Sequence, residues 1–245
     1  MKARSLAYSG WRADSKSFVG SLFAAFLSAF LVFFVEVQRR PKITIVQEKK
    51  ACVLQDGRKF LRVVVANRAI RWPLKLVMDR RPASQVRAWI TFLTESNDRV
   101  FGPERDMIGR WSNTPEPVRP MFIAQNPGGA QQMTFFFDLS VTRDAVDIGS
   151  GATEMLDIVM RRPDEAGCRG WHNRGMIQNA NPEDLFELAA GRYHAQVRVD
   201  VSGRSFNAFF RIVCDVGIAD FRLEPLRLRN SWSPAVRKAR KKACL

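Results

Sequence analysis

Histidine, tyrosine and cysteine are scarce in this chain of 245 residues, which has two, two and four of them. A zinc centre is built from several Cys, His or carboxylate ligands at short spacings, and the sequence contains no CxxC or HxxxH pair. Nucleophile-elbow, Walker and GxGxxG motifs are absent as well. The sequence therefore predicts no cofactor and no metal, and it favours a protein that is not an enzyme.

One arrangement offers a catalytic alternative. Cys168 and His172 stand four residues apart in Cys-Arg-Gly-Trp-His, and an imidazole close to a thiol can generate a cysteine nucleophile. The alternative function is thus an envelope-associated enzyme that uses these two residues. The simpler interpretation is a loop cysteine and a solvent-facing histidine. His194, the second histidine, is predicted to lie on the surface of a sheet.

The four cysteines show no paired spacing; they are Cys52, Cys168, Cys214 and Cys244. In an oxidising compartment Cys52 could bond to Cys214, because both fall on predicted strands. In a reducing compartment the same two residues would be small apolar core residues. No N-x-S/T sequon is present, so the sequence leaves the compartment open.

Charge is missing from eighteen consecutive residues, Phe18 to Val35. A helix of this length covers ~27 Å, close to the ~30 Å hydrocarbon core of a bilayer. The following residues, Glu36 to Pro41, lack the small-residue cleavage site of a signal peptide. A buried core helix would need a large helical partner, which the strand-rich remainder does not offer. We predict a basic tail over residues 1–17 and an uncleaved transmembrane helix over 18–37.

Basic residues flank this helix in nearly equal numbers. Four precede it and five follow it: Lys2, Arg4, Arg12, Lys16, then Arg39, Arg40, Lys42, Lys49 and Lys50. The positive-inside rule compares lysine and arginine near the two ends of a span. The prediction is a single-pass membrane protein with the lipid bilayer as its partner, and the side of the bilayer on which the domain lies stays open.

Small residues recur at four-residue spacing along the predicted helix, at Gly20, Ala24 and Ser28. Such a stripe lets two helices approach closely in lipid. It predicts a homodimer through the helix, while the alternative is that small residues are simply common in such helices.

The last 24 residues are strongly basic. From Arg222 onward there are eight basic residues and one acid, Glu224, in a chain with a net charge of +15. A tethered basic tail is attracted to anionic lipid headgroups, and the candidate contacts are Arg237, Lys238, Arg240, Lys241 and Lys242. Nucleic-acid binding through the same tail is an alternative, and a solvated tail without a ligand is another.

Residues 38–221 read as one β-domain. Asp56-Gly57 separates two β-rich runs and predicts a hairpin, as does Ser202-Gly203 between 192–201 and 205–215. Further strands are predicted at 85–94, 132–140 and 154–161. Val197, Val199 and Val201 alternate with polar residues, which is typical of an antiparallel sheet exposed on one face. These strands, without intervening helices, predict a β-sandwich.

A family resemblance refines this prediction. The stretch 188–199, in which Gly191 and Tyr193 begin a strand, resembles the penultimate strand of immunoglobulin-like domains. The resemblance implies a tyrosine whose hydroxyl bonds back to the preceding corner. The whole layout resembles uncharacterised bacterial membrane-anchored proteins with one such domain. The expected fold is mainly β: an immunoglobulin-like antiparallel β-sandwich preceded by one transmembrane α-helix. The expected function is that of a non-catalytic interaction or structural module.

Two insertions and one tryptophan complete the prediction. Residues 69–82 form a basic, amphipathic linker between strands, and residues 168–188 are predicted to include a helical turn capped by Asn181 and begun by Pro182. Trp111 lies in the segment 109–117. It is either an interface anchor, since tryptophan is favoured at interfaces, or a core residue.

Overall fold

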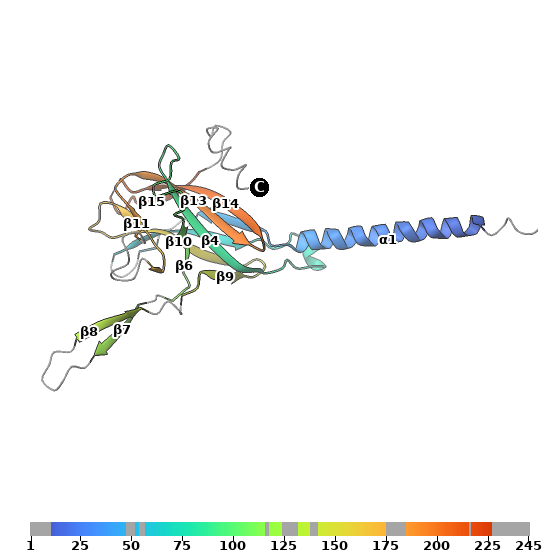
Figure 1. Cartoon of the computed structure of the whole chain (residues 1–245), viewed down its shortest axis with the longest axis horizontal. Coiled ribbons are helices and arrows are strands. Elements are labelled where there is room, and N and C mark those ends of the chain that lie inside the picture. The colour runs from blue at the N-terminus through green and yellow to red at the C-terminus, as the bar shows by residue number, and fades with distance from the viewer. Residues whose placement is uncertain are drawn as a thin grey trace, which may run out of the picture. The chain divides into compact units, whose positions relative to one another are not determined.

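The computed structural model describes residues 11–47, 52–53, 57–115, 118–123, 132–137, 142–174, 185–215 and 217–226. These residues divide into two compact units. One unit holds residues 11–40 and 69–81, with the helix α1 (Trp11–Arg39) and the short 3₁₀ helix Leu74–Leu76. The other unit holds residues 41–68 and 82–226 and is built from strands (Figure 1).

Two antiparallel sheets make up the second unit. The larger sheet has the order β1-β3-β10-β11-β12, with β2 paired to β3 and β6 paired to β10. Its strands are β1 (Ile43–Gln47), β2 (Cys52–Val53), β3 (Lys59–Asn67), β6 (Arg110–Trp111), β10 (Thr153–Arg161), β11 (Cys168–Gly170) and β12 (Glu187–Leu188).

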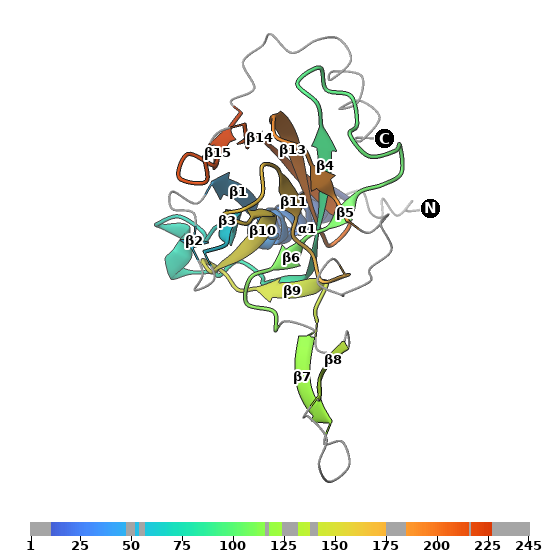
Figure 2. The ribbon, with the colours of Figure 1, turned by 90° about the vertical axis from the view of Figure 1, so that its left-hand side faces the viewer.

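The smaller sheet has the order β15-β14-β13-β4-β5, with β9 also paired to β4. Its strands are β4 (Ala83–Leu93), β5 (Met107–Ile108), β9 (Ala145–Ile148), β13 (Arg192–Val201), β14 (Arg204–Val213) and β15 (Arg222–Pro225). A separate ladder pairs β7 (Val118–Ile123) with β8 (Gln132–Phe137). Figure 2 shows β1, β3 and β10 facing the layer of β13, β14 and β4. The prediction of a mainly β sandwich preceded by one helix is confirmed.

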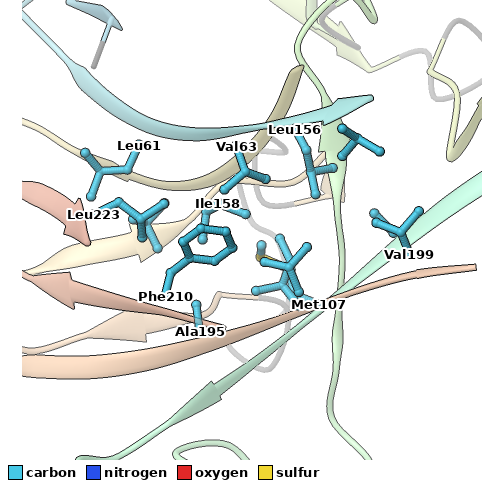
Figure 3. Close-up of a cluster of buried hydrophobic side chains, with 14 of the residues drawn as sticks. Leu61, Val63, Met107, Leu156, Ile158, Ala195, Val199, Phe210 and Leu223 are labelled. Atoms are coloured by element: carbon cyan, nitrogen blue, oxygen red, sulfur yellow. The ribbon is translucent and has the colours of Figure 1, made fainter. Parts of the chain in front are cut away.

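Apolar side chains from both sheets fill the space between them. Leu61, Val63 and Ile158 extend from the larger sheet toward Phe210 and Ala195 of the smaller one (Figure 3). Each of these five is at most 2% exposed. At roughly 25 cal/mol per Å² of apolar surface removed from water, this layer is the main source of stability.

The predicted alternation along 192–201 is confirmed: Val197, Val199 and Val201 are buried, and the residues between them are half-buried. The hairpin across Ser202 and Gly203 is also confirmed. Both residues have positive φ, +47° and +72°, as a type I′ turn requires, and β13 pairs with β14 in unbroken register. At the first predicted hairpin β2 pairs with β3 and Gly57 has φ +77°.

The elements differ from the predicted boundaries at both ends. The helix begins at Trp11, seven residues before the uncharged run, so residues 11–17 of the predicted basic tail are helical. The sandwich extends to Pro225, since β15 pairs with β14, so residues 222–225 belong to a sheet and not to a basic tail. The predicted turn at Asn181 and Pro182 lies outside the described residues.

The core makes a first prediction. Phe210→Ala removes a ring that is 2% exposed between the sheets, and we expect it to lower the free energy of unfolding by about 3–5 kcal/mol. Val46→Ala, at a site that is 46% exposed, should cost less than about 1 kcal/mol. Urea unfolding of the full chain in detergent measures both. Equal costs would contradict the assignment of Phe210 to the core.

Candidate functional site

The helix α1 has no buried apolar stripe. Its stretch Val19–Arg39 is long and apolar enough to cross a membrane, and none of it is buried. The exposed side chains lie on every side of the helix, as the high exposures of Phe23, Phe26 and Val32 illustrate (68%, 73% and 64%). A helix that is apolar all round is normally covered by protein or by lipid. Within the described residues, α1 is therefore the largest uncovered apolar surface.

The predicted dimer face is part of this helix. Gly20, Ala24 and Ser28 are all exposed on α1, and a Cβ added at Gly20 would meet no neighbouring atom. Dimerisation through these residues stays a prediction. The predicted lipid contacts, Arg237, Lys238, Arg240, Lys241 and Lys242, lie outside the described residues, so their binding to lipid or nucleic acid also stays a prediction.

Cys168 and His172 are not a loop cysteine and a solvent-facing histidine. Cys168 is in β11 and 4% exposed, and His172 is 5% exposed. The His172 ring packs edge-on against Phe186, with 5.4 Å between ring centroids. The loop position predicted for Cys168 and the exposure predicted for His172 were wrong. The strand β12 pairs with β11, and Phe186 packs on His172, contacts that the local sequence does not reveal.

The thiol of Cys168 forms a hydrogen bond with Cys214. This bond and burial raise the pKa of Cys168, and the same bond lowers the pKa of Cys214. The Cys214 thiol also lies 3.3 Å and 3.2 Å from the carbonyl oxygens of Ala189 and Gly191. Cys214 thus has Cys168 beside it and is a buried free thiol, as in the alternative in which it is a small core residue and not bonded to Cys52. A protonated, buried Cys168 is poorly suited to act as a nucleophile.

A buried ionic cluster lies on the larger sheet. The carboxylate of Asp157, fully buried in β10, accepts hydrogen bonds from three side chains: Arg62 (2.5 Å), Arg110 (2.8 Å) and Ser112 (2.8 Å). Arg110, 5% exposed, also donates to the Thr114 carbonyl at 2.7 Å. The three bonds to Asp157 tie β10 to β3 or to the segment around β6. The arrangement leaves both Asp157 oxygens engaged, which indicates a structural role.

Sequence reasoning missed this cluster, although it noticed the segment 109–117. The useful signal was Gly109 beside Arg110 and Trp111. A Cβ at Gly109 would lie 2.7 Å from Leu156 and 3.0 Å from Ala88, so only glycine permits this close approach. Trp111 is fully buried. Of the two interpretations left open for it, the core residue is correct.

The cluster yields a second prediction. Asp157→Ala leaves the buried Arg110 without its carboxylate partner, and we expect the free energy of unfolding to fall by about 3–5 kcal/mol. The matched control is Asp200→Ala, which removes a surface carboxylate 3.4 Å from Arg198 and should cost at most about 1 kcal/mol. Urea titrations of both variants in detergent provide the measurement. A cost for Asp157→Ala as small as that of the control would contradict the structural role.

His194 is buried, at 8% exposure, where a surface position was predicted. Its Nδ1 lies 3.0 Å from the Oδ1 of Asn97. Asn97 belongs to the turn after β4, which pairs with β13 at Leu93 and His194, so that turn covers the ring. Burial and the nearby charge of Arg211 lower the pKa of His194, and Glu95 raises it to a smaller extent.

This pKa shift gives a third prediction. The unfolded chain takes up a proton near pH 6.5, whereas the folded chain does so only at lower pH. The stability that neutral His194 contributes is therefore complete above about pH 6.5 and decreases as the pH falls through that value. We expect the unfolding free energy of His194→Gln to depend less on pH between about 7 and 5 than that of the native chain. Parallel pH dependences in urea titrations would disprove this.

A polar hollow of about 530 Å³ lies beside β9. Its lining includes Arg87 and Arg143 together with Asp144, Asp147 and Glu154. Two of these acids are occupied within the protein: Asp147 accepts from the backbone N–H of Gln85 at 2.7 Å, and Glu154 accepts from Asn113 at 2.8 Å. No group of three metal-ligating side chains occurs in the part of the chain that the structure describes.

Comparison with known proteins adds little. No family model and no curated protein matches the chain. Among solved structures, a match is a family 123 glycoside hydrolase from Clostridium perfringens, studied for the hydrolysis of glycolipid glycans. The identity is 11%, the TM-score is 0.30, and the match covers 76% of this chain and 27% of that chain. The chain thus spans about a quarter of that enzyme's length.

Proposed function

We propose that the chain is a single-pass, membrane-anchored β-sandwich that acts as a non-catalytic interaction or structural module. The observation that carries this proposal is the uncovered apolar surface of α1, in a chain whose sandwich has its own buried core. None of the stretch Val19–Arg39 is buried. In water, so large an apolar surface would favour aggregation, while in a bilayer it is matched to its surroundings. The helix is therefore the anchor.

The use of the polar side chains supports a role without catalysis. The thiol of Cys168 is hydrogen-bonded to Cys214, the His172 ring packs on Phe186, and the carboxylate of Asp157 forms ion pairs with two arginines. Each of these groups contributes to packing or to the tie between strands. None of them combines an accessible nucleophile with a neighbouring base, which an enzyme with a cysteine nucleophile would need.

An immunoglobulin-like domain is the form of sandwich that we propose. The predicted tyrosine bond supports it: the Tyr193 hydroxyl donates to the Ala189 carbonyl at 3.2 Å, four residues earlier. This is the contact by which the tyrosine of such domains fastens the corner before its strand. Domains of this kind commonly serve as binding or spacer modules.

The anchor is tested by placing charge in the helix. Phe26→Lys with Phe30→Lys puts two charges at the middle of the proposed span, each at a cost of about 2.5–3.5 kcal/mol. We expect the native chain to remain in the membrane fraction through an alkaline carbonate wash and the variant to be largely lost from it. Val46→Lys with Met155→Lys, which adds two charges at exposed sandwich sites, should behave like the native chain.

A cleaved signal sequence can be as long and as apolar as this helix, but it predicts a different outcome for the mature protein. The intact mass of the mature protein would then lack residues 1 to about 40, and carbonate would release the domain. Either finding would overturn the proposed anchor.

A further inference from the structure

Three apolar side chains stand out from the segment 69–81, which connects β3 to β4. Trp72, Leu76 and Val77 are 78%, 78% and 79% exposed. In the sandwich unit the most exposed large apolar residues in the described part are Val46 and Met155, at 46% and 41%. A tryptophan with two aliphatic neighbours, all nearly fully exposed, is unfavourable in water unless something else covers them.

Hydrogen bonds hold this segment to the end of α1. The Arg81 backbone N–H donates to the Arg39 carbonyl at 2.8 Å, and the Arg81 guanidinium donates to Glu36 at 2.8 Å. The Arg80 guanidinium donates to the Arg40 carbonyl. These acceptors span about one turn at the C-terminal end of the apolar helix. The segment thus packs where the helix changes from apolar to charged residues (Figure 1).

The backbone of the segment is suited to a medium with little water. Its tip forms a 3₁₀ turn in which the N–H groups of Leu76 and Val77 donate to the carbonyls of Pro73 and Leu74, at 3.0 and 3.1 Å. The N–H of Met78 also donates to Leu74. Backbone groups that are satisfied internally lower the cost of entering lipid.

The charges around the apolar tip are those of a membrane interface. Arg71 and Lys75 are exposed beside Trp72 and Leu76. The whole segment has four basic residues and one acid, Asp79. Tryptophan is enriched at the level of the headgroups, and basic side chains there contact lipid phosphates.

We propose that Trp72, Leu76 and Val77 insert into the lipid interface beside the end of α1, with Arg71 and Lys75 at the headgroups. The inference rests on the proposed membrane anchor and adds a second lipid contact to it. Continuity with the apolar surface of α1, fixed by the contacts of Arg80 and Arg81, identifies lipid as the occupant.

The test uses the full chain in phosphatidylcholine–phosphatidylglycerol vesicles whose acyl chains carry bromine near the headgroup. Trp72→Phe removes one tryptophan, and the native-minus-variant spectrum gives the emission of Trp72. We expect this emission to be blue-shifted and quenched by more than about half. Trp89→Phe is the matched control, because Trp89 lies on the sandwich beside Arg198, and its difference spectrum should be unquenched.

A second variant tests the tip as a unit. Leu76→Ser with Val77→Ser keeps Trp72 and removes its apolar neighbours, which are exposed and so contribute little to the folded core. We expect the Trp72 emission to shift to the red and its quenching to fall at least about two-fold. Unchanged quenching would show that Leu76 and Val77 do not hold Trp72 in the lipid, which would contradict the insertion of the three residues as a unit.

The outcomes separate the two proposals. If the chain fails to float with the vesicles, the membrane anchor itself is wrong. If it floats but the Trp72 emission is unquenched, the anchor stands and the interfacial contact is overturned. If it floats and Trp72 alone of the two tryptophans is quenched, both are supported.

Discussion

Apolar burial between the two sheets is the constraint on which the rest of the structure depends. The buried cluster that contains Val63, Ile158 and Phe210 consists, among the described residues, of side chains from the sandwich unit alone. Because the sandwich meets its own need for a core, the apolar surface of the helix has no partner within the described chain. In the proposed function, lipid covers that surface. The proposal of an anchored module rests on this uncovered helix surface.

Polar groups buried inside the sandwich find their partners within the sandwich as well. Asp157 joins β10 to Arg62 of β3 and to Arg110 of β6, and the Cys168–Cys214 contact joins β11 of the larger sheet to the residue after β14 of the smaller one. Buried charge and buried thiols are tolerated because neighbours satisfy them. Cys168, one of the two residues of the enzyme alternative, thus takes part in a contact between the two sheets.

The sequence was sufficient where the signal is local. Alternation along 192–201, two turn residues at Ser202 and Gly203, and eighteen uncharged residues predicted a strand, a hairpin and a helix that the structure contains. It was insufficient where distant residues provide the environment. His194 is covered by a turn 97 residues away, and the carboxylate of Asp157 finds its arginines 47 and 95 residues away. The position of the segment 69–81 against α1 depends on the fold of everything between them.

The pairing of β4 with β13 has a consequence for synthesis. Leu93 lies opposite His194. The interior strand β4 therefore cannot pair with β13 until about a hundred further residues have been synthesised. At ribosomal rates of about 5–20 residues per second, that wait lasts roughly 5–20 s. During this time the apolar face and open edge of β4 are available to other chains or to chaperones. The hairpin of β13 and β14, which closes locally, ends this exposure when it emerges.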